Sequence, residues 1–305
     1  MCFAHIGQVT YLAYIALCLI WGSTFMAIKL GLADAPPLTT AALRFCVALA
    51  LIFMLARWKR VSLPVGWRAR GRLALPGFFI FGLNYAFVYL AEVHITSSLT
   101  AILYGSIPFW VALFSLGLLK QERLTMIAWI GIVIGFVGVV VISYDQFTVS
   151  GDLFYGSLLT LAACAAASFG TVLHKRLHTE APVLAAVLLQ MTLGWLVLIP
   201  LALVFERPSD FVPTAHSIGS VVYLATLGTV AAFLLFYWLI QRLKVITLSM
   251  IDFISPLIAV FIGVVLYNEP LSTRVAIGSA LVLGGVALVL RREKAPPPTS
   301  QFPRQ

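Results

Sequence analysis

Two long segments of this chain, LKQERLTMIAWIGIVIGFVGVVV at 119–141 and LYNEPLSTRVAIGSALVLGGVAL at 266–288, follow one pattern at an offset of 147 residues. The alignment matches one glutamate and two glycines: Glu122 with Glu269, Gly131 with Gly278, and Gly138 with Gly285. Each segment has a charged start followed by a long apolar run. Internal similarity at this distance predicts that the chain consists of two structurally related halves.

The composition indicates a membrane protein. The chain of 305 residues is 61% hydrophobic and 10% charged, with a mean hydropathy of +1.03. A soluble domain would need far more charge on its surface. Runs such as WIGIVIGFVGVVVI at 129–142 lack the period-two alternation of barrel strands, and about 20 apolar residues span a bilayer as a helix. We therefore expect an all-α membrane protein with ten transmembrane helices, near 9–30, 37–57, 73–92, 96–119, 125–143, 153–174, 182–205, 217–241, 246–267 and 274–290.

The repeat divides these spans into two sets of five. The first half covers 9–143, the second covers 153–290, and 291–305 form a tail. Because five is odd, the second half enters the membrane from the opposite face, so the repeats are inverted. Lys29 at the end of the first span aligns with Lys175 at the end of the sixth.

The distribution of basic residues predicts the orientation. Of the 20 Lys and Arg residues, most fall in alternate loops and the tail: Arg57, Lys59, Arg60, Arg68, Arg70, Arg72, Lys120, Arg123, Lys175, Arg176, Arg242, Lys244, Arg291, Arg292, Lys294 and Arg304. By the positive-inside rule this side is cytoplasmic, so both termini lie inside the cell. The net charge of +9 is spread over membrane loops. We expect the lipid bilayer, and no nucleic acid, as the partner of these residues.

Two prolines occupy matching positions in the two halves. Pro108 lies in YGSIPFWVALF at 104–114 and Pro256 in FISPLIAVFIG at 253–263. A proline inside a helix removes a hydrogen bond and costs about 3 kcal/mol. Interrupted helices at matching places in two inverted halves are typical of a transporter's binding site. We interpret Pro108 and Pro256 as hinges; the alternative is that both only kink helices for packing.

The chain also resembles a known family. LIWGSTFMAIKLGL at 19–32 and PPLTTAALRFCVALAL at 36–51 resemble the opening of an EamA-type transporter of the drug/metabolite transporter superfamily, and the two segments quoted first resemble the ends of its repeats. The resemblance covers about 10–290. It implies ten helices in two inverted repeats, a central cavity and, usually, export of amino acids or other small metabolites. Sugar-phosphate and nucleotide-sugar exchangers are more distant relatives. The end of the sixth span, FGTVLHKRL at 169–177, departs from the aromatic and polar pattern expected there.

Charged residues inside spans are the first candidates for a site, because each costs roughly 2.5–3.5 kcal/mol in the membrane. Arg44 could bind a substrate carboxylate, or it could form a structural ion pair with Glu92. Asp252 lies one turn before Pro256 and could bind an ammonium group or carry a proton, with Glu92 as the second proton-coupling candidate; the alternative is a hydrogen-bonded aspartate near the headgroups. Lys29 at a span end can extend to the interface, so we discount it as a ligand.

Uncharged polar and aromatic residues complete the predicted substrate site. These are Trp21, Asn84, Tyr85, Tyr89, Tyr104, Gln190 and Ser255, while Tyr237 and Trp238 could instead belong to the interfacial aromatic belt. His174 and His178 have the i,i+4 spacing of a metal pair, but we interpret them as a solvated helix end. We predict no metal, no cofactor and no catalytic residue. The pairs Gly131/Gly135 and Ala280/Gly284 favour close helix packing within the chain or across a homodimer.

The sequence therefore predicts a secondary active transporter at the cell membrane. It would export small metabolites such as amino acids or amphipathic drugs by alternating access. A phosphorylated-sugar or nucleotide-sugar exchanger and a membrane-embedded enzyme remain as alternatives. The exchanger would need several cations at membrane depth, and the enzyme would need clustered catalytic groups.

Overall fold

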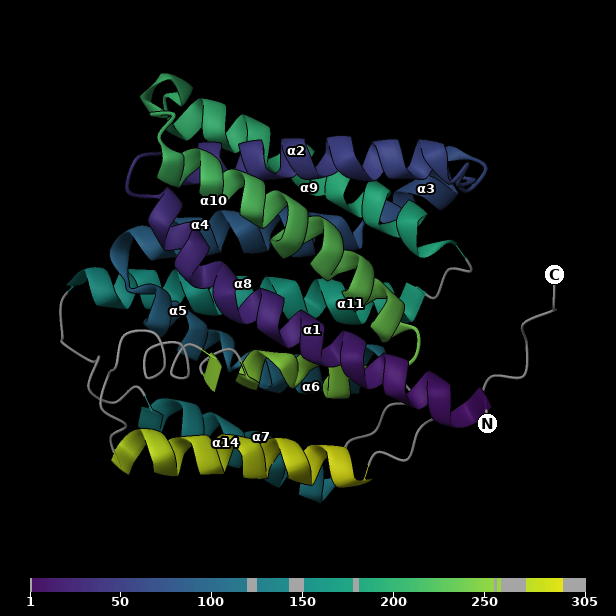
Figure 1. Cartoon of the computed structure of the whole chain (residues 1–305), viewed down its shortest axis with the longest axis vertical. Coiled ribbons are helices and arrows are strands. Elements are labelled where there is room, and N and C mark those ends of the chain that lie inside the picture. The colour runs from purple at the N-terminus through teal and green to yellow at the C-terminus, as the bar shows by residue number, and fades with distance from the viewer. Residues whose placement is uncertain are drawn as a thin grey trace.

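The fold is a bundle of helices. The computed structural model describes residues 2–119, 125–142, 151–177, 181–254, 257–258 and 273–292, and every regular element in these ranges is helical (Figure 1). In chain order the elements are α1 (Cys2–Gly31), α2 (Pro37–Trp58), α3 (Trp67–Ala74), the π-helical turn η1 (Phe78–Leu83), α4 (Asn84–His94), α5 (Ser97–Tyr104), α6 (Ile107–Leu118), α7 (Met126–Ile142), α8 (Gly151–Leu177), α9 (Val183–Phe205), the 3-10 turn η3 (Pro208–Asp210), α10 (Ala215–Ala225), the π-helical turn η4 (Thr226–Ala231), α11 (Ala232–Ile240), α12 (Val245–Ser249) and α14 (Thr273–Arg292).

Several helices are long and apolar enough to cross a membrane. Within the described ranges five helices qualify, and a sixth does so if the bent pair Trp67–Ala74 and Phe78–His94 is one span. Four shorter apolar helices accompany them: Ile107–Leu118, Met126–Gly138, Val245–Ile254 and Ala276–Val289. The all-α membrane class is confirmed, while the count of ten spans stays a prediction.

The two π-helical turns lie at corresponding positions of the chain. η1 begins at Phe78 and η4 at Thr226, 148 residues apart, and each turn contains six residues. Such turns widen a helix locally and are frequent at functional sites. Next to η1 the backbone of α9 comes very close, because a Cβ atom placed on Gly77 would lie 2.0 Å from the carbonyl oxygen of Gln190. Only glycine fits at this crossing.

The predicted span at 96–119 is two helices. α5 ends at Tyr104 and α6 begins at Ile107, so the break precedes Pro108, which lies in the first turn of α6. At that position no backbone N–H is required, and the fixed φ of proline suits the start of a helix. From the sequence we expected Pro108 to remove a hydrogen bond inside a continuous helix; in the structure it removes none, because it lies in the first turn of α6. Pro256 and Ser255 lie outside the described residues.

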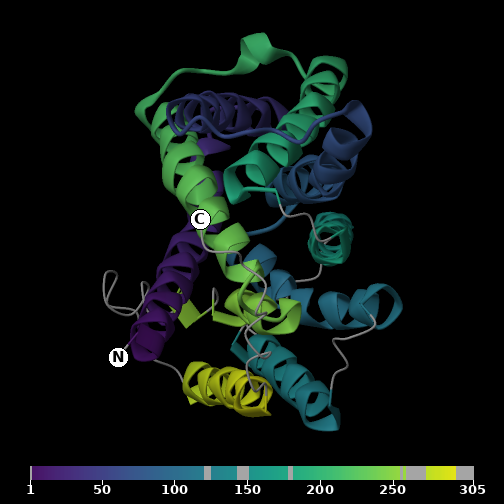
Figure 2. The ribbon, with the colours of Figure 1, turned by 90° about the vertical axis from the view of Figure 1, so that its right-hand side faces the viewer.

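The segments that revealed the repeat pack against each other. α7 and α14 lie side by side at one edge of the molecule (Figure 1, Figure 2). A Cβ atom on Gly131 would lie 2.8 Å from the carbonyl oxygen of Gly285, and one on Gly138 would lie 2.7 Å from that of Gly278. The crossing is antiparallel, and the glycines serve contact within the chain. The glycines of α14 that contact α7 are Gly278 and Gly285. Gly284, which we had named from the sequence, faces open space.

In each half of the chain, a lysine side chain caps the C-terminal end of another helix by donating to its last carbonyl oxygens. Lys29 Nζ donates to the carbonyl oxygens of Glu92 (2.5 Å) and Ile95 (3.1 Å). Lys175 Nζ donates to those of Ile240 (2.5 Å) and Leu243 (3.1 Å). A cation is favourable at the C-terminal end of a helix, where carbonyls lack partners. Lys29 is thus a helix-capping residue. From the sequence we expected its side chain to extend to the membrane interface instead.

Replacing either lysine by methionine should destabilise the fold. Each change removes two hydrogen bonds from a charged donor and leaves helix-end carbonyls unsatisfied, so we expect Lys29→Met and Lys175→Met each to lower the free energy of unfolding by about 2 kcal/mol. Denaturant unfolding in detergent micelles measures this. Lys59→Met, at an exposed helix end, is the control and should change little. Equal stability of all three variants would contradict the capping role.

Candidate functional site

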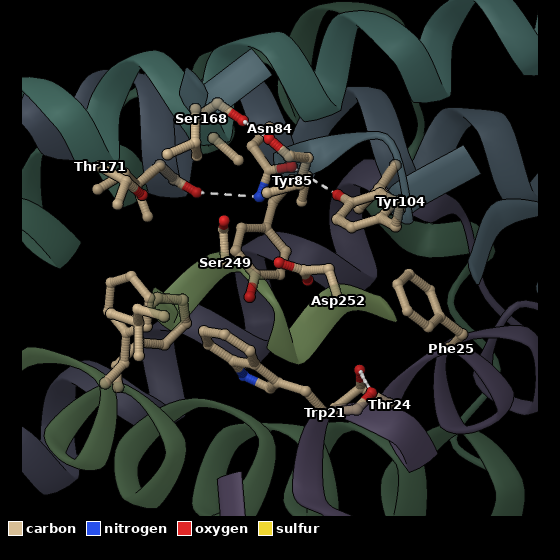
Figure 3. Close-up of a pocket in the computed structure, with 18 of the residues that line it drawn as sticks. Trp21, Thr24, Phe25, Asn84, Tyr85, Tyr104, Ser168, Thr171, Ser249 and Asp252 are labelled. Atoms are coloured by element: carbon tan, nitrogen blue, oxygen red, sulfur yellow. Dashed lines mark hydrogen bonds between the residues drawn. The ribbon is translucent and has the colours of Figure 1, made fainter. Parts of the chain in front are cut away.

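A cavity lies inside the bundle, and its wall comes from segments of both halves of the chain. The lining residues are Trp21, Thr24, Phe25, Ile28, Arg44, Ile80, Asn84, Tyr85, Val88, Tyr104, Ile107, Val111, Ala167, Ser168, Thr171, Phe233, Phe236, Val245, Leu248, Ser249 and Asp252. Six of the predicted site residues are in this wall: Trp21, Arg44, Asn84, Tyr85, Tyr104 and Asp252. Residues separated by more than 200 positions therefore meet around one space (Figure 3).

One side of the cavity carries a chain of neutral hydrogen bonds. The Tyr104 hydroxyl donates to Asn84 Oδ1 at 2.5 Å, and Asn84 Nδ2 donates to the carbonyl oxygen of Ile80 in η1 at 3.2 Å. Ser168 lies on the same side (Figure 3). The π-helical turn thus presents a backbone carbonyl that a side chain of the cavity wall satisfies.

Arg44 is the cation of the cavity. Its side chain is 1% exposed, and its four hydrogen bonds run to Thr229 Oγ1 (2.8 Å), the Gly228 carbonyl (3.3 Å), the Tyr89 hydroxyl (3.4 Å) and the Tyr85 hydroxyl (3.5 Å). The guanidinium also lies 4.7 Å from the centroid of the Tyr85 ring. All of these partners are neutral. The alternative of an Arg44–Glu92 ion pair is not formed, because neither carboxylate oxygen of Glu92 has a hydrogen-bond partner among the described residues.

Asp252 supplies the acidic side chain of the cavity wall, and aromatic rings lie around it. Its carboxylate and the Ser249 hydroxyl point into the cavity between Tyr85 and Trp21 (Figure 3). The Trp21 ring lies 5.5 Å from that of Phe233 and 5.3 Å from that of Phe236. A carboxylate beside aromatic faces can hold an organic cation through charge and through cation–π attraction.

Three of the predicted residues lie behind the wall. Tyr89 and Glu92 are fully buried in α4, and Gln190 is fully buried in α9. Gln190 accepts a hydrogen bond from the Tyr237 hydroxyl, and its Nε2 lies 2.8 Å from His174 Nδ1. One interpretation from the sequence, for His174, and one alternative left open, for Tyr237, are wrong here. His174 is a half-buried partner of Gln190 and no solvated helix end, and Tyr237 is 1% exposed and no interfacial belt residue. His178 lies outside the described residues.

Several residues of the wall were missed by the sequence analysis. They are Thr24, Phe25, Ser168, Thr171, Phe233 and Phe236. Phenylalanine and hydroxyl residues are common in any membrane helix, so nothing in the sequence distinguishes these. The internal repeat could have indicated one of them, because Phe233 lies 148 positions after the predicted site residue Tyr85 and so occupies the matching position of the second half. No cluster of three His, Cys, Asp or Glu residues that could hold a metal ion exists within the described ranges.

A bundle of apolar helices long enough to span a membrane, with an arginine and an aspartate in the wall of a buried cavity, defines a class, the polytopic helical membrane proteins. The comparison with known families then identifies the chain. The model of the EamA-like transporter family matches residues 8–144 and again 154–291, so the chain belongs to this family.

Related proteins agree with this assignment. The chain is 29% identical to an uncharacterized transporter of Archaeoglobus fulgidus over 275 residues, which is 89% of this chain and 95% of the relative. It is 27% identical to the uncharacterized inner membrane transporter YedA of Escherichia coli K12, covering 91% of this chain and 89% of YedA. One crystal structure superposes with a TM-score of 0.75 at 22% identity, over 94% of this chain and 99% of that one, which supports the fold. Family and relatives thus indicate a multi-pass membrane transporter rather than an enzyme.

Proposed function

We propose that the chain is a secondary transporter that carries small zwitterionic or amphipathic metabolites, such as amino acids or amphipathic drugs, out of the cell by alternating access. The observation that supports this is the cavity, which places Arg44 and Asp252 in one aromatic-lined wall. A solute with separated opposite charges and an apolar body matches such a wall. Charges of this kind in a membrane interior are costly and are typical of substrate pathways.

The architecture proposed is ten spans in two inverted five-helix halves, at 9–143 and 153–290, with both termini in the cytoplasm. Three pairs of matching features support it. The turns η1 and η4 lie 148 positions apart, Lys29 and Lys175 cap helix ends alike, and α7 crosses α14 antiparallel at matched glycines. Related halves in opposite orientation allow each half to adopt the other's conformation, which opens a central site to either face in turn.

Asp252 provides a test of the binding mode. We expect Asp252→Asn to weaken transport of a cationic or zwitterionic solute by about tenfold or more, because the amide cannot neutralise an ammonium group. A neutral analogue that lacks the ammonium group should be transported equally by both proteins. Initial rates in proteoliposomes measure this. An equal loss for both solutes would show that Asp252 acts on the fold and not on the solute.

The proposed function itself is tested by flux into proteoliposomes. The panel consists of labelled neutral amino acids, one cationic aromatic drug and one sugar phosphate, each with and without an imposed pH gradient. Saturable flux of an amino acid or of the drug is expected. Flux of the sugar phosphate alone would favour an exchanger, although Arg44 is the only Lys or Arg in the described cavity wall. No flux of any solute would contradict the proposed substrates.

A further inference from the structure

Glu92 in α4 is a buried carboxyl group that nothing in the described structure satisfies. Its side chain is 0% exposed, and neither Oε1 nor Oε2 has a hydrogen-bond partner among the described residues. An ionised carboxylate cannot be left in such a place without a large desolvation cost, whereas a protonated one can. Glu92 also lies outside the cavity wall, so a solute in the cavity does not reach it.

Two cations lie near Glu92, and both are occupied by neutral partners. Lys29 on α1 is bound to the main-chain carbonyl of Glu92 itself, and Arg44 on α2 is bound to the hydroxyl of Tyr89, one turn before Glu92 on α4. The ammonium of Lys29 is bound to the main-chain carbonyls of Glu92 and Ile95. The guanidinium of Arg44 is bound to hydroxyls and to one backbone carbonyl. The Glu92 carboxyl group is hydrogen-bonded to neither cation, so an ion pair with one of them would require another conformation.

The remaining titratable groups around Glu92 are weaker acids. The Tyr89 hydroxyl of α4 is bound to Arg44, and the Tyr104 hydroxyl of α5 is bound to Asn84. α8 packs on the other side of α4 and has no Asp, Glu, Lys or Arg between 153 and 174; its Tyr155 ring lies 5.0 Å from that of His94, and its Cys164 is buried. Of the two described cations, Lys29 caps the end of α4 through the carbonyls of Glu92 and Ile95, so we take Arg44 as the one that changes partner.

Arg44 joins the two halves of the chain. It lies on α2, and its bonds to Thr229 and to the Gly228 carbonyl attach it to η4, a turn of the second half. Its other two bonds, to Tyr85 and Tyr89, stay within the first half. Tyr89 and Glu92 are three residues apart on α4, so they lie on neighbouring positions of one helix face. A guanidinium that left η4 would find Glu92 next to the tyrosines it already contacts.

We propose that the protonation of Glu92 controls a connection between the halves, in which Arg44 binds η4 when Glu92 is protonated and pairs with Glu92 when the proton has left. The proton goes to solvent, and Arg44 keeps its charge throughout. In the deprotonated state the ion pair replaces the bonds to Thr229 and Gly228, and η4 is released. This inference rests on the alternating access proposed above and supplies it with a proton-dependent step.

The second half lacks this device. At the position 148 residues after Tyr89 stands Tyr237, and it bonds to the neutral Gln190 where Tyr89 bonds to Arg44. The residue 148 positions after Glu92 is Ile240. Both halves thus have a buried tyrosine hydroxyl bonded to a polar side chain. In the first half that side chain is the cation Arg44 and a carboxyl group lies one turn further along the helix, whereas the second half has neither at the matching positions. A proton therefore acts on one half, which gives the two otherwise similar conformations different pH dependence.

The first test measures the proton directly. Infrared difference spectra of the full chain in liposomes, taken across a pH series, should contain the carbonyl stretch of a protonated carboxyl group that disappears as pH rises. The band should be lost in Glu92→Gln and retained in Asp252→Asn, which separates the two carboxyl groups of the spans. Glu92→Asp keeps a carboxyl group if the glutamine variant does not fold, and its band should shift in pH midpoint. A band lost in Asp252→Asn and kept in Glu92→Gln would overturn the proposal.

The second test measures the connection. Amide hydrogen exchange of the segment Thr226–Ala231 should become about tenfold faster in the wild type than in Glu92→Gln at pH values above the midpoint, and equal below it, because loss of the Arg44 bonds loosens the turn. Comparison at equal pH cancels the chemical dependence of exchange on pH. Identical exchange in both proteins at every pH would overturn the proposal. Neither test uses a substrate, so failure here is distinct from failure of the flux assay.

Discussion

Arg44→Ala is expected to reduce transport by about a hundredfold or more, since the change removes the cavity's cation together with several buried, charge-assisted hydrogen bonds. The variant also leaves Thr229, Tyr85 and Tyr89 without their shared donor. Initial rates of solute flux in proteoliposomes at equal protein density measure the effect.

Arg44→Lys is the matched control. It keeps the charge but has no planar fork to reach η4 and the two tyrosines at once, so its flux should fall between wild type and Arg44→Ala. Thermal unfolding in detergent separates loss of function from loss of fold. Near wild-type flux in Arg44→Ala would contradict a role for this cation in either binding or connection.

Gly285→Leu is expected to be the most destabilising single change among the glycines of the helix pair at the edge of the molecule. A Cβ atom at Gly285 would lie 2.5 Å from the carbonyl oxygen of Gly131 and 2.6 Å from the backbone nitrogen of Gly135. Backbone atoms cannot move aside as side chains can, so α7 and α14 would have to separate. We expect a loss of about 3 kcal/mol or more in the free energy of unfolding.

Gly284→Leu is a control one residue away. A Cβ atom there meets nothing within 4 Å, so the same substitution should leave stability near that of the wild type. Denaturant unfolding in micelles compares the two. If both variants were equally stable, the close approach of α7 to α14 would not be needed for the fold.

Helix class and span boundaries could be predicted from the sequence where spans are long and uniformly apolar. The expected span at 37–57 corresponds to α2 at Pro37–Trp58, and that at 182–205 to α9 at Val183–Phe205. Both begin at a proline signal and end at charged residues. The break before Pro108 could be suspected but not positioned, because a proline fits equally well at a kink or in a first helical turn.

The site was predictable to the extent that its residues are chemically unusual in a membrane. Arg44 and Asp252 stood out as charges, and both line the cavity. Direction of side chains could not be predicted, so Tyr85 at the cavity and Tyr89 behind it looked equivalent. The π-helical turns were not predicted from the sequence. They matter to the site because they present the backbone carbonyl oxygens of Ile80 and Gly228, to which Asn84 and Arg44 donate hydrogen bonds.

The central claim, that the cavity opens to each side of the membrane in turn, is tested most directly by labelling. Cys2, Cys18, Cys46 and Cys164 are replaced by serine, and Ser249, which lines the cavity, is changed to cysteine. A membrane-impermeant thiol reagent is then applied to one face of oriented vesicles at a time. The account predicts labelling from both faces, slowed by a transported solute. Labelling from one face alone, unaffected by any solute, would contradict alternating access.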